Sequence, residues 1–281
     1  MTETIKEIPL DELHPFPDHP FGVRDDEAME QTVESIREYG ILVPAIARPR
    51  EEGGYELIAG HRRKHACEIA GIKTMPVIVR DIDRNAAVII MVDSNLQREN
   101  ILPSEKAKAY KMKLEAIKRQ GARHDLTSTQ VAQKLSVEKV AEEAGTSKDQ
   151  IRRFIRLNEL EPQLMQMVDE GKIGMTPAVE ISYLKPEEQK LLIETIDSEQ
   201  ATPSFSQAQR MKKLSQEGKL NDDAMLGIMM EQKKPENWDL KLPMDRIRKY
   251  FPRSYTPQRM EETIIKLLDT WMKKRQRDQQ R

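Results

Sequence analysis

The sequence predicts an α+β protein in which a small mixed α/β domain precedes an all-α part. Two observations lead to this prediction. Short apolar segments of strand length occur only within the first 80 residues. From about residue 85 onward, apolar residues instead recur at helical spacing over longer stretches. We therefore expect an α/β domain at 1–85, an all-α domain at 86–197, a linker at 198–237 and a helical module at 238–281.

The first 80 residues contain alternating strand and helix signals. Prolines 15, 17 and 20 interrupt regular structure after the first strand, so a loop is expected there. Gly53 and Gly54 favour a tight turn between two apolar segments, which predicts a hairpin. The expected elements are a strand at 5–10, a helix at 25–39, hairpin strands at 43–47 and 55–59, a helix at 61–70 and a strand at 75–80.

The rest of the chain favours helices. Apolar residues at helical spacing predict helices at 86–96 and 104–120. The polar stretch 198–237 has few aromatic residues and is expected to be a flexible linker or loosely packed helices. Pro257 is suited to the start of a final helix. That helix carries one apolar stripe, formed by Met260, Ile264, Leu267, Leu268 and Trp271, and the stripe predicts a helical oligomerisation module.

Composition limits the classes of function. The chain has 46 lysines and arginines and 47 aspartates and glutamates, so affinity for nucleic acid must come from local clusters of charge. Its single cysteine, Cys67, can form neither an intramolecular disulfide nor a cysteine-based zinc cluster. No apolar run approaches the ~20 residues that span a bilayer. We expect a cytoplasmic protein with no membrane partner.

Residues 139–160, KVAEEAGTSKDQIRRFIRLNEL, predict a helix-turn-helix. Gly145 permits the turn, and Ser147 is suited to cap the second helix. Apolar residues of the two helices should then pack together: Val140, Ala141, Ala144, Ile151, Phe154 and Ile155. The outward residues expected to contact DNA are Thr146, Ser147, Lys148, Gln150, Arg152 and Arg153. An ordinary helical pair with a solvated basic face is the alternative.

A second cluster, GHRRKHA at 60–66, lies where a strand is expected to lead into a helix. A glycine there lets a ligand approach the backbone, and the free amides of the first helical turn attract anions. Arg62 and Arg63 add guanidinium groups, which suit bidentate recognition of phosphate. The pattern predicts a site for a triphosphate or for nucleic-acid phosphates. Salt bridges on a surface helix are the alternative.

The order of the motifs extends this interpretation. ILVPAI at 41–46, GGYELIAGHRRKHACEIAG at 53–71 and SNLQREN at 94–100 precede the helix-turn-helix. Together they resemble the ParB family of partition proteins over roughly residues 5–185. The resemblance implies a sulfiredoxin-like N-terminal domain that binds CTP with Mg²⁺, a helix-turn-helix for a palindromic double-stranded DNA site, and C-terminal dimerisation. It also implies that the nucleotide closes a clamp around DNA and that a ParA-type ATPase is a partner.

Carried over by position, the resemblance assigns nucleotide contacts to Gly60, His61, Arg62, Arg63, Asn95, Gln97 and Arg98. Asn95 is also the expected Mg²⁺ ligand. The chain departs from the family pattern at three places: Val43 replaces a glutamine, His61 a glutamate, and Ser94 an acid. CTP binding is still expected, whereas slow CTP hydrolysis is left open, because a serine hydroxyl is a weaker group for positioning water or metal than a carboxylate.

Other functions remain open. A transcriptional regulator or an occlusion factor would use the same architecture without segregating DNA from a plasmid, chromosome or mobile element. An enzyme is a different class of function. Sulfiredoxin-like chemistry requires a cysteine in the loop where this chain has His61, while Cys67 lies further into the helix. A nuclease requires clustered acids for metal ions, and Asp81, Asp83 and Asp93 form no such pattern.

Overall fold

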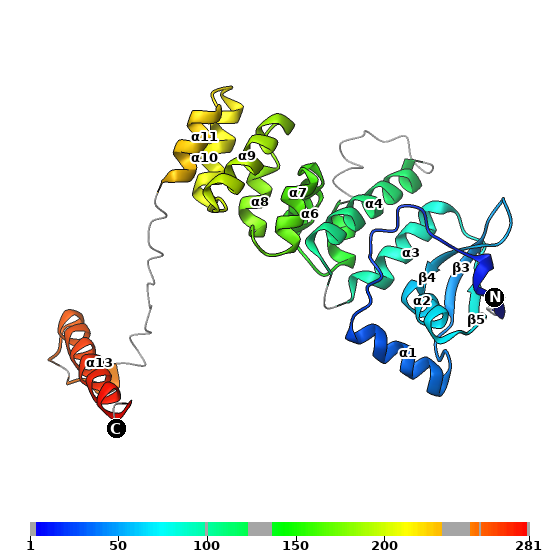
Figure 1. Ribbon diagram of the computed structural model, residues 1–281, viewed down its shortest axis with the longest axis horizontal. Coiled ribbons are helices and arrows are strands. Elements are labelled where there is room, and N and C mark those ends of the chain that lie inside the picture. Colours follow the sequence, from blue (N-terminus) through cyan, green and yellow to red (C-terminus); the bar gives the residue numbers. More distant parts are fainter. Residues whose placement is uncertain (1–3, 99–100, 123–136, 232–247, 253, 280–281) are drawn as a thin grey trace. The chain divides into compact units, whose positions relative to one another are not determined.

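The structure is a computed structural model that describes residues 4–98, 101–122, 137–231, 248–252 and 254–279. The chain divides into two compact units, residues 1–231 and 232–281 (Figure 1). The first unit combines a sheet with a series of helices, and the described part of the second is helical. The predicted α+β class is confirmed.

A five-stranded mixed sheet forms the N-terminal part, in the order β1-β5-β3-β4-β2. Strand β3 pairs antiparallel with β4, as the predicted hairpin requires, and parallel with β5. Strand β2 was not predicted, because three residues that include Pro15 are too short to show alternation. It lies at the edge beside β4, where a proline is tolerated. The strands are β1 (Ile5–Pro9), β2 (Leu13–Pro15), β3 (Ala45–Pro49), β4 (Tyr55–Ala59) and β5 (Thr74–Val79).

Helices cover both faces of this sheet. Successive side chains of a strand point to opposite faces, so Leu57 and Ile58 belong to different hydrophobic clusters. Leu57 packs with α1 (Glu27–Tyr39) and α2 (His61–Ala70), drawn in blue and cyan in Figure 1. Ile58 packs instead with α3 (Arg84–Leu96) and with residues of the loop after β2. The expected helices at 25–39, 61–70 and 86–96 are confirmed to within two residues.

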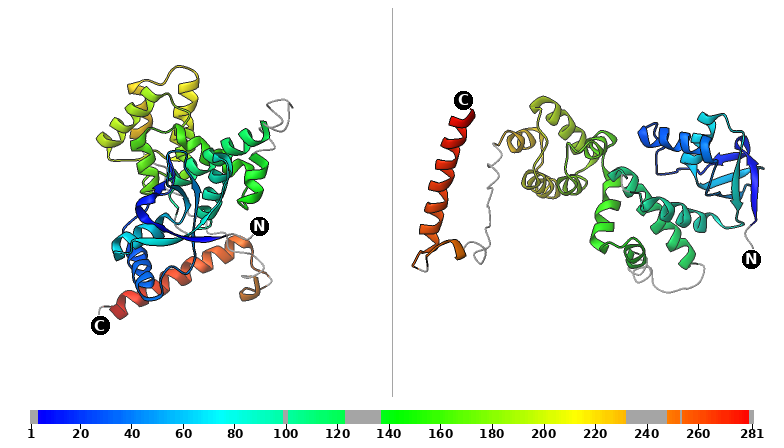
Figure 2. Two further views of the ribbon diagram at one scale, coloured as in Figure 1. Left: turned by 90° about the vertical axis from the view of Figure 1, so that its right-hand side faces the viewer. Right: turned by 90° about the horizontal axis from the view of Figure 1, so that it is seen from below.

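Helix α4 (Pro103–Ala122) connects the sheet domain with the helices that follow (Figure 2). Its residue Ala109 belongs to the cluster on the sheet, Tyr110 to the cluster of the helix-turn-helix, and Ala107 to the cluster of the later helices. The helices after it are a helical segment at 137–143, α6 (Lys148–Arg156), η2 (Leu157–Glu159), α7 (Pro162–Asp169), α8 (Met175–Ile181), α9 (Pro186–Glu199), α10 (Phe205–Gln216) and α11 (Asp222–Met230).

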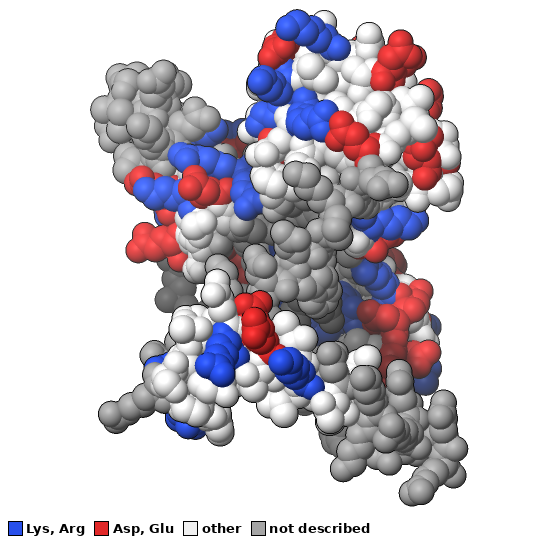
Figure 3. Space-filling view, turned by 90° about the vertical axis from the view of Figure 1, so that its left-hand side faces the viewer, with Lys and Arg blue, Asp and Glu red and all other residues white. Residues whose placement is uncertain are grey.

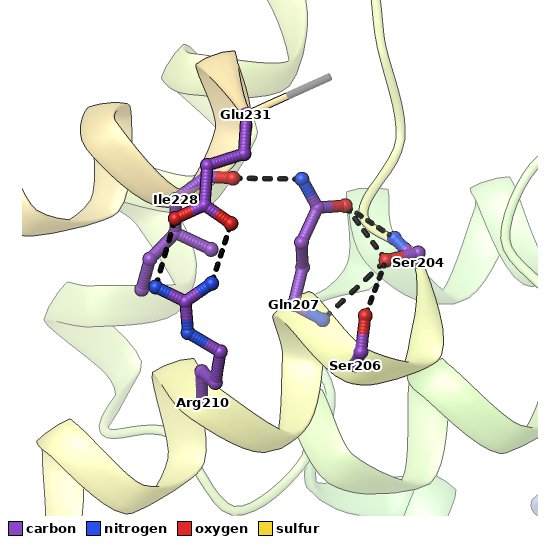
Figure 4. Close-up of polar contacts among 6 residues, drawn as sticks. All are labelled: Ser204, Ser206, Gln207, Arg210, Ile228 and Glu231. Carbon is purple, nitrogen blue, oxygen red and sulfur yellow. Dashed lines mark hydrogen bonds and ion pairs between the residues drawn. The ribbon is translucent and has the colours of Figure 1, made fainter. Parts of the chain in front are cut away.

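The expected linker at 198–237 differs from the structure, because α10 and α11 are packed helices. Met211 and Met225 are fully buried in the same cluster as α7, α8 and α9. The polar residues that suggested a linker instead hold the helix ends together (Figure 4). Gln207 donates to the carbonyl oxygen of Ile228 at 2.7 Å, and Arg210 makes two contacts with Glu231 at 2.5 and 2.9 Å. Residues 232–237 lie outside the described residues.

The second unit contains η3 (Arg248–Tyr250) and α13 (Pro257–Gln279), which begins at the proline expected to open it. Met260 is buried against the turn that precedes the helix. Leu267, Leu268 and Trp271, further along the predicted stripe, are each more than half exposed. Among the described residues, no helix is both long enough and apolar enough to cross a membrane.

Candidate nucleotide and DNA sites

Gly60 sets the geometry at the start of α2. Its φ of 113° lies in a region that favours glycine, and an added Cβ would approach the Cβ of Ala45 to 2.9 Å. Gly60 caps α2 without any side-chain hydrogen bond, so the amides of the first turn point out of the helix end. This end of α2 can accept an anion, as the sequence predicted.

The two arginines of the motif have different surroundings. Arg62 lies 3.4 Å from Asp26, the residue that caps α1, and this pair is partly exposed. Arg63 donates to the carbonyl oxygens of Val43 and Pro44, the latter at 2.9 Å. Arg63 therefore holds the loop before β3 in place, while the contact of Arg62 with Asp26 is a weak one that an incoming phosphate can replace.

Arg98 adds a third guanidinium group to this end of α2. Partial desolvation lowers the pKa of Arg98, and the neighbouring positive charges of Arg62 and Arg63 lower it further. Like charges held together in this way favour the binding of a polyanion, because an anion relieves their repulsion. Gln97, at the C-terminal end of α3, is exposed. The structure thus brings the arginines of two separated motifs together.

His61 stacks on His19, a histidine that the sequence analysis did not assign to the site. The two ring centroids are 3.9 Å apart. Burial, followed by the neighbouring charges of His19, Arg98 and Lys64, lowers the pKa of His61 to about 3. Burial also lowers the pKa of His19. Both imidazoles are therefore neutral at physiological pH. Neither residue type nor spacing connects the two positions in the sequence, so only the fold reveals this pair.

Asn95, the expected Mg²⁺ ligand, is almost fully buried on α3. Its amide nitrogen donates to the carbonyl oxygen of Met91 at 2.8 Å, while its Oδ1 has no hydrogen-bond partner among the described residues. One free amide oxygen fits a cation. However, protein-bound Mg²⁺ ordinarily takes one or two carboxylates as well. The described residues contain no group of three or more His, Cys, Asp or Glu side chains arranged to hold a metal ion, so the donor set does not match that preference.

The proline-rich loop is tied to α4 through Glu105, a contact that the sequence analysis did not predict. The backbone amide of Gly22 donates to Glu105 Oε1 at 2.9 Å, and Arg24 lies 3.6 Å from the same oxygen. Glu105 also accepts from the amide of Leu102 at the start of its own helix. Since the same loop carries His19, it links the nucleotide site to α4.

The helix-turn-helix folds as expected. Ser147 caps α6 by accepting from the amide of Gln150 at 3.1 Å, and Gly145 adopts a positive φ of 61° in the turn. The six apolar residues predicted to pack together, Val140, Ala141, Ala144, Ile151, Phe154 and Ile155, all belong to one cluster. The polar residues predicted to contact DNA consequently lie outside this cluster, at the turn and along the N-terminal part of α6.

The basic residues among the predicted DNA contacts have protein partners in the structure. Lys148 pairs with Glu138, and Arg152 lies 3.1 Å from Asp149 on the helix surface. These exposed ion pairs are weak and can exchange for phosphate. Arg153 instead donates to the Thr176 hydroxyl of α8 at 2.8 Å, which positions it between two helices. Thr146, Ser147 and Gln150 lie at the N-terminal end of α6, beside these basic residues.

Family models match most of the described chain. The ParB N-terminal domain matches residues 1–96, and the ParB HTH domain matches residues 99–217. A nucleoid occlusion protein of Bacillus pumilus is 31% identical over 218 residues, which cover 77% of this chain and 69% of that protein. The chain belongs to the ParB family. The resemblance drawn from the motif order is confirmed.

Other ParB-family relatives carry partition names. Stage 0 sporulation protein J of Bacillus subtilis is 36% identical over 173 residues, or 62% of this chain and 55% of that protein. Chromosome-partitioning protein Spo0J of Thermus thermophilus is 32% identical over 182 residues, or 64% of this chain and 61% of that protein. The matched region thus spans a little more than half the length of these two relatives.

Solved ParB structures are also similar to this chain. One is the C-terminally truncated ParB of Caulobacter crescentus complexed to the centromeric parS site, with 24% identity, a TM-score of 0.44, and coverage of 74% of this chain and 98% of that one. Another is the same truncated protein complexed with CTP-gamma-S, with 27% identity, a TM-score of 0.32, and coverage of 67% and 96%. Membership of the ParB family depends on the sequence matches and not on these superpositions.

Cys67, Asp83 and Asp93, which were considered for enzymatic roles, have structural surroundings in this ParB-family chain. Cys67 is fully buried, and burial raises the pKa of its thiol, so it is a poor nucleophile. Asp83 caps α3 by accepting from the amide of Ala86. Asp93 pairs with Lys113, whose side chain is fully buried and also contacts Glu143. These contacts argue against sulfiredoxin-like or nuclease chemistry.

Charge on the surface is mixed. On the face drawn in Figure 3, lysine and arginine side chains lie among aspartate and glutamate side chains instead of forming one basic field. This agrees with a net charge of −1 for the whole chain. The basic residues of α6 and the arginines near α2 are therefore local features, as the composition requires for any binding of phosphate.

Proposed function

We propose that this protein is a partition protein that binds a specific double-stranded DNA site through α6 and binds CTP at the N-terminal end of α2. The observation that carries the proposal is the grouping of Arg62, Arg63 and Arg98 beside the free first-turn amides of α2. Such a group of cations and amides suits a triphosphate. CTP is the nucleotide that membership of the ParB family implies.

DNA binding is supported by the geometry of α6. Its N-terminal half presents Gln150 and Arg152 beside the exposed Lys148, while its inner face is buried in the cluster of the helix-turn-helix. A helix in this arrangement can enter the major groove, where glutamine and arginine read base edges and lysine contacts phosphate. We assign the same role to Thr146, Ser147 and Arg153.

Communication between the two sites is supported by the contacts of α4. Lys113 of α4 contacts Asp93 of α3 at 2.5 Å and Glu143 of the first helix of the helix-turn-helix at 2.6 Å. Asp93 lies on the same helix as Asn95. A nucleotide that shifts α3 would therefore disturb the contact with the DNA-binding domain, which is the coupling that a nucleotide-gated DNA clamp requires.

The proposed assembly is a homodimer. The exposed apolar side chains of α13 suit a second copy of the same helix, and a dimer suits a palindromic site. A ParA-type ATPase is the partner that family membership implies. We expect the protein to associate with the bacterial nucleoid in the cytoplasm, because its proposed ligand is chromosomal or plasmid DNA.

Calorimetric titration with each of CTP, ATP, GTP and UTP, with and without duplexes that carry a candidate palindromic site, tests this function. We expect heat of binding for CTP alone, with tighter binding when the cognate duplex is present. A scrambled duplex of equal length and composition is the control. Equal binding of all four nucleotides, or of none, would contradict the proposal, as would equal affinity for cognate and scrambled duplexes.

Nucleoid occlusion is the second candidate function. It is favoured by the Bacillus pumilus relative, which is named for that role. The chain matches 69% of the length of that relative. Mapping of the bound sites across the genome separates the two candidates. Sites clustered near one replication origin, or on one plasmid, indicate partition, whereas sites dispersed over the chromosome indicate occlusion.

A further inference from the structure

Three buried side-chain polar atoms lack a hydrogen-bond partner among the described residues: His19 Nε2, His61 Nε2 and Asn95 Oδ1. Buried polar atoms are ordinarily satisfied, so each requires an explanation. All three belong to the surroundings of the proposed nucleotide site. Arg98 is close enough to both imidazoles to lower their pKa, and Asn95 lies one turn before it on α3. The missing partner is therefore expected to be a ligand.

The hydrogen bonding of His19 shows which kind of ligand its free nitrogen can take. His19 Nδ1 lies 2.8 Å from the carbonyl oxygen of Phe21, and a carbonyl can only accept, so Nδ1 carries the proton. The Nε2 atom of the neutral ring then presents a lone pair. An imidazole whose Nδ1–H is held by a backbone carbonyl is the usual arrangement of a metal-binding histidine.

We propose that His19 and His61 bind a divalent transition-metal ion of the zinc class, such as Zn²⁺ or Co²⁺, which accompanies the nucleotide in place of Mg²⁺. The proposal rests on the proposed nucleotide binding. Two imidazole nitrogens suit such ions, whereas Mg²⁺ prefers carboxylate, phosphate and water oxygens. The ring centroids lie 3.9 Å apart, so both imidazoles are within reach of one ion once each ring turns its Nε2 atom toward it.

Charge makes the site conditional on the nucleotide. Arg98 and Lys64 lie close enough to His61 to lower its pKa, and they would repel a bare cation in the same way. A bound triphosphate reverses the local charge and supplies oxygen ligands. It also completes the coordination, because the described residues contain no group of three His, Cys, Asp or Glu ligands. The metal ion and the nucleotide are thus expected to bind together.

Titration of the full chain with CTP in MgCl₂, in CoCl₂ or in EDTA tests the proposal. We expect CTP to bind about tenfold or more tightly with Co²⁺ than with Mg²⁺, which is the effect expected of added metal ligands. His19→Phe and His61→Phe retain a stacked ring but remove the nitrogen ligand, so each should bring the ratio of CTP affinity in CoCl₂ to that in MgCl₂ down to about one, whatever its effect on CTP affinity in MgCl₂. His65→Gln, on the same helix as His61, is the matched control, because His65 instead contacts Asp25.

Proton NMR of the Co²⁺ complex gives a readout that does not depend on affinity. Imidazole protons of metal-bound histidines are strongly shifted by paramagnetic Co²⁺, and the Nδ1 proton of His19 is held by Phe21. We expect shifted signals that are lost in His19→Phe and His61→Phe. The variant His61→Glu, which offers an oxygen ligand, should move the preference back toward Mg²⁺.

The outcomes separate this inference from the proposed function. If CTP binds equally well with Mg²⁺ and Co²⁺, and the Co²⁺ complex shows no shifted imidazole signals, the metal assignment is overturned while nucleotide binding stands. If CTP binds under none of the three conditions, the proposed nucleotide function fails, and the metal site fails with it. Tight binding of Co²⁺ without CTP would also overturn the proposal, since it makes the site independent of the nucleotide.

Discussion

Gly60 is one of the glycines at which both the backbone conformation and the neighbouring atoms disfavour a side chain. Alanine at this position combines a positive φ, which costs about 1 to 2 kcal/mol, with a Cβ contact of 2.9 Å to Ala45. Gly71, at the other end of α2, also has a positive φ but open space around it. We expect Gly60→Ala to lower the free energy of unfolding by about 2 kcal/mol more than Gly71→Ala. Urea denaturation measures the free energy of unfolding of both variants. Equal losses in the two variants would show that the contact with Ala45 does not contribute to the cost.

Protonation of His61 links stability to pH. The pKa of His61 is lowered from its usual 6.5 to about 3 in the folded state, so the unfolded chain takes up the proton first as the pH falls. The contribution of His61 to the free energy of unfolding is therefore fully present above pH 6.5. This contribution is lost as the pH falls from 6.5 toward 3. Between pH 7 and pH 5 we expect a loss of about 1 to 2 kcal/mol that can be assigned to His61. Urea denaturation of His61→Gln should show a correspondingly flatter profile, whereas His65→Gln should follow the unmodified protein.

The contacts of Lys113 predict an asymmetry between two ways of breaking them. Lys113 has no exposed surface, whereas the side chains of Asp93 and Glu143 are 45% and 37% exposed. Removing both acids with Asp93→Asn and Glu143→Gln leaves a buried, unpaired charge and should cost about 3 to 5 kcal/mol. Lys113→Met leaves two carboxylates that water can reach, so its cost should be smaller. Chemical denaturation gives both values, and the reverse order would show that Lys113 is not held by these pairs.

At the scale of the element, α6 has a polar outer face and an apolar inner face that can be altered separately. Gln150→Ala and Arg152→Ala should each weaken binding of the cognate duplex by about 1 to 3 kcal/mol if they read bases. Binding of random duplex should change much less. Lys190→Ala, an exposed change on α9, is the control. Fluorescence anisotropy measures the affinity of each variant for both duplexes. An equal loss of affinity for the cognate and the random duplex would show that Gln150 and Arg152 contact phosphate and do not read bases.

Most elements could be predicted because their signals are local. The boundaries of α2, for example, follow from Gly60 and Gly71, and those of α6 from Gly145 and Ser147. Strand β2 was missed because its three residues, which include Pro15, are too few to show the alternation of a strand. For α10 and α11, expected as a flexible linker or loosely packed helices, the close packing was missed because their buried methionines lie among polar residues that cap and join the helix ends.

The candidate site was predictable only in part. The arginines at 62 and 63 follow a recognisable motif, and Arg98 follows from the family resemblance. His19 and Glu105 could not be found in this way, since each joins the site through a loop whose path depends on tertiary contacts. The partners of Arg63 are likewise distant backbone carbonyls, which no residue pattern specifies.

At the scale of the whole molecule, self-association should depend on the exposed stripe of α13. Leu268→Asp places a charge within that stripe and should convert a dimer to a monomer, because it would bury an unpaired carboxylate at the interface. Lys266→Gln, exposed on the same helix, should have no such effect. Sedimentation equilibrium gives the association state, and an unchanged dimer would place the interface elsewhere.

Helix α4 also determines how residues of the first unit unfold and exchange their amide hydrogens. Ala107, Ala109 and Tyr110 of this one helix belong to three different hydrophobic clusters, so α4 cannot separate from one of them without disturbing the others. Local fluctuations that release single helix ends elsewhere leave these contacts intact. The central amides of α4 should accordingly be among the last in residues 4–231 to exchange with deuterium, and only through unfolding of the unit as a whole.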